Sequence, residues 1–179
     1  TSGTKTLTLD TVAPVVAITA PAAGSTVSSA GVAVTGTVND TAVSMALLIL
    51  NGGMPQVVPV VGGAFSQNIT LVPGANTIIV VTTDRVGNTS SSGAPLTVTL
   101  DNTKPGVAVT APANRLLTNV ASLTVTGTTD ELTGVGTLYL NGVAQPLSIA
   151  SWDGSFSRAV PLVAGDNTIE VRVADRAVP

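Results

Sequence analysis

Apolar and polar residues alternate along most of this chain in short runs that Gly, Pro and Asn interrupt. A period of two residues is typical of β-strands with one buried face, and β-branched residues fill these runs. The first half of the chain therefore predicts seven short strands, and no stretch shows the 3.6-residue period of a helix. These strands are expected at residues 15–20, 31–38, 45–50, 55–61, 64–71, 76–83 and 95–100.

The second half of the chain repeats the first. Residues 7–10 (LTLD) return as residues 98–101 (VTLD), and residues 65–66 (FS) return as residues 156–157 (FS), in both cases 91 residues later. A period of this size is one small domain rather than a solenoid repeat of 20–50 residues. Seven short strands in one such period fit an immunoglobulin-like β-sandwich. The sequence therefore predicts an all-β chain with two tandem immunoglobulin-like sandwiches.

The repeat places one sandwich at residues 10–100 and the other at residues 101–179, where the second is incomplete. Its pattern stops shortly after Asp175, so the second sandwich is expected to lack its last strand within the chain. Residues 1–9 match the last strand of the first sandwich, and they form an orphan strand with no sandwich before it. A sandwich edge without its strand exposes backbone groups and tends to recruit one.

Three explanations of this arrangement remain open at this point. Residues 1–9 of one subunit complete the second domain of the next subunit by donor-strand complementation, with Leu7 and Leu9 entering the exposed core. Alternatively, the chain is a two-period piece of a longer covalent array, or a trimmed chain with frayed ends. The first two explanations yield a head-to-tail fibre.

Inward positions of the strands keep their apolar character in both copies, and this predicts the two cores. In the first copy these positions are Val16, Ile18, Val32, Val34, Leu48, Leu50, Phe65, Ile69, Leu71, Ile78 and Val80. In the second copy they are Val107, Val109, Leu123, Val125, Leu138, Leu140, Phe156, Val160, Leu162, Ile169 and Val171.

The outward face of two neighbouring strands differs between the copies. The first copy is aliphatic there, whereas the second has Tyr139, Glu170 and Arg172. Either a loop or an extra strand covers these aliphatic side chains, or they form a contact face for a neighbouring chain. The subunit-interface hypothesis names Leu47, Ile49, Ile79 and Val81, beside the strand residues Leu7 and Leu9.

Composition narrows the classes of function. Charged residues make up 9% of the chain, against roughly 25% in ordinary soluble domains, so its surface is unusually apolar. Such a surface suits either a secreted protein rich in threonine or a subunit that buries much of its outside. Cys and His are both absent, which excludes disulfides and His- or Cys-based catalytic triads. The net charge of −3 without a basic cluster argues against nucleic-acid binding, and no apolar run reaches membrane-span length.

Several motifs resemble those of bacterial immunoglobulin-like domains of secreted and surface proteins. The resemblance rests on residues 10–14 (DTVAP) and 101–105 (DNTKP), on 73–78 (PGANTI), and on 84–88 (DRVGN). Residues 153–157 (DGSFS) and 164–169 (AGDNTI) also carry it. It covers almost the whole chain. Such domains serve as stalks of adhesins, as fibre repeats and as accessory modules beside polysaccharide-degrading enzymes, so the resemblance implies an extracellular or cell-surface location.

Acidic residues gather in loops that this topology brings to one pole of each sandwich. In the second sandwich these are Asp101, Asp130, Glu131 and Asp175. Carboxylate oxygens from several loops are suitable ligands for Ca²⁺, which takes 6–8 of them. Structural Ca²⁺ is therefore a candidate ligand, and no other cofactor is expected. Asp and Asn are also ordinary turn residues, which explains the same positions without a metal.

Glycans are the other candidate partners. Trp152 has no aromatic counterpart in the first copy, and with Asp153 it is a candidate sugar-contacting loop, although a cover over its own sandwich is the stronger interpretation. Glycosylation patterns occur at Asn39, Asn68 and Asn88, and short polar loops explain them equally well.

The sequence thus predicts a non-enzymatic protein that acts mechanically. It favours a structural repeating subunit of an extracellular fibre or filament, joined by strand complementation or as a covalent tandem array, whose partners are copies of itself. The alternative is a stalk or accessory module of a larger secreted adhesin or polysaccharide-acting enzyme.

Overall fold

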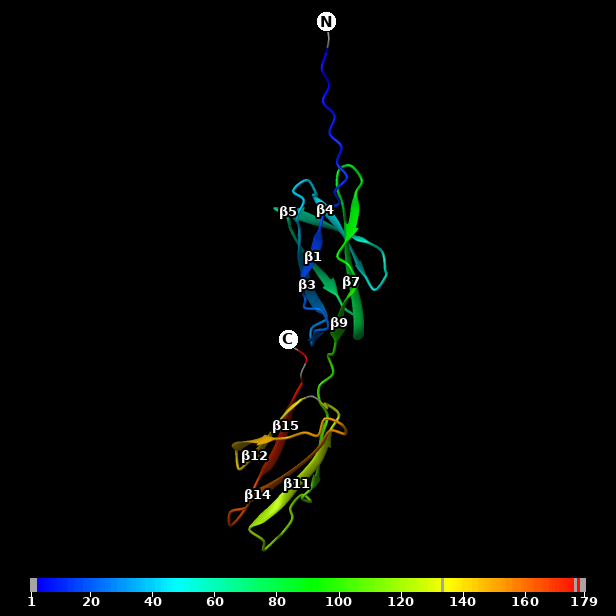
Figure 1. The fold of residues 1–179 in the computed structure, drawn as a ribbon. Helices are drawn as coiled ribbons and strands as arrows, with labels where there is room; N and C mark the ends of the chain where they lie inside the picture. The colour runs from blue at the N-terminus through cyan, green and yellow to red at the C-terminus, as the bar shows by residue number, and fades with distance from the viewer. Residues whose placement is uncertain (1–2, 133, 176, 178–179) are drawn as a thin grey trace. The chain divides into compact units, whose positions relative to one another are not determined.

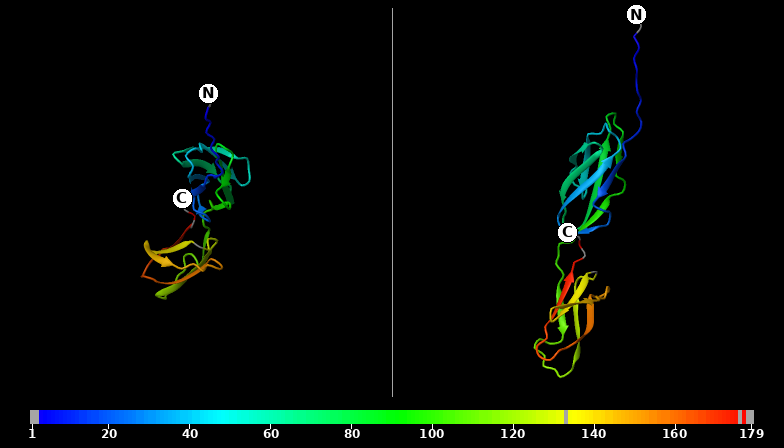
Figure 2. Two further views of the ribbon diagram at one scale, coloured as in Figure 1. Left: turned by 45° about the horizontal axis from the view of Figure 1, so that its top comes forward. Right: turned by 90° about the vertical axis from the view of Figure 1, so that its left-hand side faces the viewer.

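A computed structural model describes residues 3–132, 134–175 and 177, and every regular element in these residues is a β-strand (Figure 1). The strands form two compact units, of which the first ends at Asn102 and the second begins at Thr103. Within each unit the strands lie in two layers, as the two views of Figure 2 show. The predicted all-β fold of tandem sandwiches is confirmed.

Within the described residues 3–102, unit 1 has nine strands, and all neighbouring strands are antiparallel except β2 and β9. Its hydrogen-bonded order is β1-β3-β6-β5-β4-β7-β9-β2, with β8 beside β7. Strand β5 pairs with both β4 and β6, so it connects the two layers. The strands are β1 (Val16–Ala20), β2 (Thr26–Val27), β3 (Gly31–Val38), β4 (Met45–Leu50), β5 (Gln56–Val61), β6 (Ala64–Thr70), β7 (Gly74–Thr83), β8 (Thr89–Ser91) and β9 (Leu96–Leu100).

The core of unit 1 follows the predicted alternation. The largest fully buried side chains include Leu48, Ile78 and Val80, and all the predicted inward positions pack in or against one cluster. The turn between β4 and β5 begins with Asn51 and Gly52, whose φ angles are 53° and 67°. Positive φ at both residues is the geometry that favours an Asn-Gly pair. The pairing of β4 with β5 ends at Leu48 opposite Gln56, so the loop here is longer than a tight two-residue hairpin.

The part of unit 2 that the structure describes, residues 103–132 and 134–175, has six strands in two separate sheets, with the orders β10-β11-β14 and β13-β12-β15. The Asn-Gly turn recurs at Asn141 and Gly142, which also have positive φ angles. Residues 148–154 form a loop between β13 and β14, where unit 1 pairs β5 directly with β6. The strands are β10 (Val107–Ala111), β11 (Ser122–Thr129), β12 (Val135–Leu140), β13 (Val143–Leu147), β14 (Ser155–Pro161) and β15 (Ile169–Ala174).

The prediction that Val107 and Val109 lie in the second core is wrong. Their exposed fractions are 38% and 43%, whereas Val16, the counterpart of Val107, is only 5% exposed. In unit 1 the buried cluster that contains Val16 also contains Val98 and Leu100 of β9. Among the described residues, unit 2 has no counterpart of β9, and its buried cluster includes neither Val107 nor Val109.

Candidate functional site: the open edge of unit 2

Strand β15 has a partner on one side only among the described residues. It pairs with β12, from Val135 opposite Ala174 to Leu140 opposite Ile169. Its counterpart β7 pairs with β4 on one side and with β9 on the other. Strand β7 begins at Gly74, and its first residues, Gly74–Ile78, are the ones that pair with β9. The equivalent strand β15 begins only at Ile169.

The missing neighbour leaves the side chains of β15 partly exposed. Ile78 and Val80 are fully buried in unit 1, but the equivalent Ile169 and Val171 are only half-buried. In unit 1, β9 pairs with Gly74–Ile78, and Ser92 exchanges hydrogen bonds with the backbone of Val80. Fully burying a side chain of this size contributes about 1.5–3 kcal/mol, so the open edge withholds a substantial part of the stability available to unit 2.

The segment of unit 2 that corresponds to β2 is not a strand either. In unit 1, β9 lies between β7 and β2, and backbone N–H groups of Gly24, Thr99 and Asp101 donate across the border to Thr97, Ser25 and Val27 at 2.7–2.9 Å. The corresponding residues 115–118 of unit 2 contain no strand. There the side chain of Leu116 is 51% exposed and that of Leu117 is 95% exposed.

An asparagine network fixes the turn beside this edge in both units. The Asn76 side chain donates to the carbonyls of Val72 and Gly74 at 2.7 and 2.9 Å and accepts from the Val72 N–H at 3.0 Å. Asn167 makes the same three hydrogen bonds in unit 2. Asn76 is fully buried, whereas Asn167 is half-buried because nothing described covers it. Sequence reasoning missed these asparagines, although their repetition in both copies was a usable signal.

The orphan strand segment predicted at the start of the chain has no regular structure within residues 3–9 (Figure 1). Its two leucines are almost completely exposed, Leu7 by 94% and Leu9 by 88%. Two large apolar side chains in water, separated by one threonine, are the pattern of a strand face that lacks its partner.

The predicted aliphatic contact face lies on the outer side of β4 and β7. Leu47 pairs directly with Val81, and Ile49 pairs with Ile79. Leu47 is 39% exposed and the other three are half-buried, so this face is partly accessible to solvent. Val57 of β5, opposite Leu47 and 60% exposed, extends it. The interface role of these residues stays a prediction.

The matching face of unit 2 is occupied by a charged pair. Arg172 Nε lies 2.7 Å from Glu170 Oε1, and the guanidinium lies 4.8 Å from the centre of the Tyr139 ring. The hydrogen bond from Arg172 lowers the pKa of Glu170 below its usual value. Both side chains are more than half exposed, so the pair contributes little to stability, and its main effect is to keep this face polar.

The acidic residues at the pole of unit 2 have different roles. Asp130 Oδ1 accepts a 2.6 Å hydrogen bond from the Gly106 N–H, as Asn39 does from Val15 in unit 1. Carboxylate oxygens of Glu131 and Asp175 lie within 4.8 Å of each other, and Asp101 directly follows β9 in unit 1. Calcium binding stays a prediction. If these carboxylates bind Ca²⁺, added Ca²⁺ raises the melting temperature. A melting temperature unchanged by Ca²⁺ or EDTA would contradict calcium binding.

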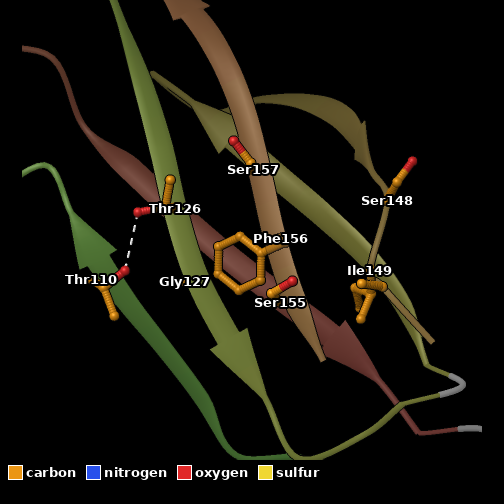
Figure 3. A pocket seen from close by; sticks show the side chains of 9 residues that line it. Thr110, Thr126, Gly127, Ser148, Ile149, Ser155, Phe156 and Ser157 are labelled. Carbon is orange, nitrogen blue, oxygen red and sulfur yellow. Dashed lines mark hydrogen bonds between the residues drawn. The ribbon is translucent and has the colours of Figure 1, made fainter. Parts of the chain in front are cut away.

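An open hollow of about 550 Å³ lies in unit 2 beside β14. Hydroxyl groups of threonines and serines line it, and Phe156 packs against β11 at Gly127 (Figure 3). No lining residue is charged, and hydroxyls without an adjacent base are weak nucleophiles. The loop that borders the hollow carries Trp152, whose exposed fraction of 80% shows that the expected cover over its own sandwich is wrong.

Comparison with known proteins agrees with this architecture. A family model described as glucodextranase, domain B, matches residues 14–102 and matches again at residues 105–178. The chain belongs to the glucodextranase domain B family. Both sandwiches are therefore domains of the same family, and the resemblance to bacterial immunoglobulin-like repeats is confirmed. Among the described residues of this family member, no helical segment has the length and apolar character of a membrane span.

Two individual proteins illustrate what this chain is similar to. Bacillopeptidase F of Bacillus subtilis (strain 168) is 32% identical over 115 residues, which are 64% of this chain and 8% of that protein. The fibronectin(III)-like modules of Clostridium thermocellum CbhA are 20% identical, with a TM-score of 0.53 over 90% of this chain and 86% of that chain. This chain thus spans less than a tenth of the curated relative, and the structural likeness shows the fold.

Proposed function

We propose that this glucodextranase domain B chain is a non-catalytic structural repeat of an extracellular fibre, in which each sandwich adds length. The repeats join head-to-tail, either by strand complementation between copies or as a covalent tandem array. The observation that supports the proposal most strongly is the open edge of β15, because the equivalent edge of unit 1 is filled by β9. An edge strand with exposed apolar neighbours favours the addition of another strand.

Propagation follows from the asymmetry of this joint. The segment that supplies a strand and the edge that accepts it are different surfaces of one chain. Such a heterologous contact repeats from copy to copy and produces a filament unless its rotation closes a ring. The apolar face around Leu47, Val57 and Val81 is a second candidate contact between neighbouring chains.

The second candidate function is that of a stalk or accessory module within a larger secreted adhesin or polysaccharide-acting enzyme. The exposure of Trp152 favours a recognition role of this kind, because an exposed indole on a loop is a suitable platform for a sugar ring. Binding to a glycan array that Trp152→Ala abolishes would support it. Met54→Ala serves as the control, because Met54 is also highly exposed but lies in unit 1.

Electron microscopy combined with mass spectrometry of the native polypeptide tests the fibre. We expect uniform filaments. A polypeptide mass near 17.7 kDa indicates strand exchange between copies, and a much larger mass indicates a covalent array. Isolated rods that do not associate at any concentration would contradict the fibre and favour the stalk module.

A further inference from the structure

The turn after β4 in unit 1 carries an asparagine followed by a glycine, a pair that is prone to lose ammonia in water. We propose that Asn51 is a latent deamidation site, which the folded sandwich protects and which opening of the turn converts to aspartate or isoaspartate. This modification goes beyond the proposed function, because it marks a fibre repeat and a stalk module alike.

The reaction needs water and no other reactant. The backbone nitrogen of Gly52 attacks Cγ of Asn51, the bond from Cγ to Nδ2 breaks, and Nδ2 leaves as ammonia with the proton that Gly52 gives up. Water then opens the five-membered succinimide at one of its two carbonyl groups, and nothing is oxidised or reduced. Asn51 and Gly52 are both exposed, and a Cβ atom on Gly52 would meet nothing within 4 Å, so water reaches this turn.

In the folded chain, two hydrogen bonds hold the side-chain amide of Asn51 against β7. Its Oδ1 atom accepts from the Thr77 N–H at 2.7 Å, and its Nδ2 atom donates to Asn76 Oδ1 at 3.0 Å. The backbone N–H of Asn51 also donates to the carbonyl of Thr77 at 2.8 Å. We call these three residues the amide clamp. Closure of the succinimide ring brings Cγ onto the Gly52 nitrogen, so both side-chain hydrogen bonds must break and their loss adds to the barrier.

The clamp is rigid because Asn76 is fixed on every side. Asn76 is fully buried, its Oδ1 atom accepts from the Val72 N–H, and its Nδ2 atom donates to the carbonyls of Val72 and Gly74. Thr77 pairs with Thr97 of β9. The protection of Asn51 therefore comes from ordered strands and not from the local sequence, and it is lost when this end of β7 opens.

The product of deamidation does not fit the clamp. A carboxylate at position 51 still accepts from the Thr77 N–H, but it has no hydrogen to donate. Its second oxygen faces Asn76 Oδ1, which is also an acceptor. Asn76 cannot rotate its amide to present Nδ2 instead without losing its three hydrogen bonds to Val72 and Gly74. The clamp therefore does not re-form, and opening of the turn leaves a permanent chemical mark.

Peptide mapping by mass spectrometry tests the protection. The natural chain is kept at mildly alkaline pH, folded in one sample and unfolded by guanidinium chloride in the other. Conversion of Asn51 is followed by its gain in mass and by the formation of isoaspartate. We expect conversion to be several-fold slower in the folded sample, because only there does the clamp hold the amide. Equal rates in the two samples overturn the proposal.

Asn51→Asp tests the misfit of the product directly, because this variant carries the carboxylate from the start. Asn68→Asp is the matched control, since it makes the same change at an exposed residue of β6. We expect Asn51→Asp to lower the melting temperature of unit 1 clearly more than the control does. Equal melting temperatures of the two variants overturn the proposal, because the carboxylate would then fit the clamp.

Discussion

A glycine beneath a phenylalanine makes one of the tightest approaches in each sandwich. A Cβ atom on Gly36 would lie 2.2 Å from Cζ of Phe65 and 2.3 Å from the carbonyl oxygen of Ala17. Gly127 has the same surroundings, with Phe156 in place of Phe65. Because a carbonyl oxygen of a neighbouring strand cannot move aside without disturbing the sheet, only glycine fits at these positions.

Gly36→Ala is therefore expected to destabilise unit 1 by about 1–3 kcal/mol, the usual cost of overpacking a well-filled core. Gly31→Ala on the same strand is the control, because nothing lies within 4 Å of its Cβ position and its φ is not positive. Urea unfolding of the two variants measures the difference. Equal stability of the two variants would show that the Phe65 ring is not held as described.

The loop after β7 depends on an aspartate. Burial alone would raise the pKa of Asp84, but hydrogen bonds from the side chain and backbone of Asn88 and from the backbone of Val86 and Gly87 outweigh it and lower the pKa. Asn88 also donates to the carbonyl of Asp10, so the ionised carboxylate organises the contact between this loop and the entry of the chain into unit 1.

The lowered pKa predicts a specific loss of stability in acid. A carboxylate with a depressed folded pKa contributes its stability fully above the unfolded value of about 3.9 and loses it as the pH falls through the folded value. We expect Asp84→Asn to be less stable than wild type near neutral pH, with the difference shrinking below about pH 4. Urea unfolding over a pH series measures this, and a difference independent of pH would contradict the assignment.

At the scale of elements, the sequence predicts the strands in which apolar and polar residues alternate. All seven strands expected in unit 1 are present with ends shifted by two residues at most. Strands β2 and β8 were missed because two or three residues are too few to show an alternation. Val107 and Val109 were misplaced because an apolar pattern records the face a residue belongs to, and not whether a partner strand covers that face.

At the site as well, the sequence predicts what the repeat shows and does not predict what depends on the path of a turn or loop. Leu7 and Leu9 are exposed, and the orphan strand stays a prediction that comes from comparison with residues 98–100. The asparagine network around Asn76 was not foreseen, because it depends on the path of the turn after β6. The exposure of Trp152 was not foreseen either, since it follows from the loop that replaces a direct pairing of β13 with β14.

The outer face of β4 and β7 provides a prediction at this scale. Ile79→Lys places a charge opposite Ile49, and the counterpart of Ile79 in unit 2 is Glu170, so the sandwich accepts a charge there. We expect the variant to keep its fold by circular dichroism and to lose assembly in analytical ultracentrifugation. Thr37→Lys, an exposed position on β3, is the control. Unchanged assembly of Ile79→Lys would remove this face from the interface.

At the scale of the whole molecule, the two sandwiches differ in how completely they are closed. Among the described residues, the core of unit 1 contains fifteen buried apolar residues and that of unit 2 contains six. Each large side chain of this kind contributes about 1.5–3 kcal/mol when buried, so unit 2 should be clearly the less stable. Calorimetry should therefore resolve two transitions, and Phe156→Ala should lower only the first of them. A single transition, or a shift of both by Phe156→Ala, would contradict this difference.

The measurement that tests the central claim most directly is calorimetry of the chain with an added peptide of residues 3–10. The Leu7→Asp variant of the chain keeps its own segment from competing. We predict that the peptide raises the lower transition with concentration, corresponding to about 2.7 kcal/mol at a hundred times its dissociation constant, and leaves the upper one unchanged. A peptide with both leucines changed to Asp should have no effect. A lower transition that the natural peptide does not move would contradict the claim that the edge of β15 accepts this strand.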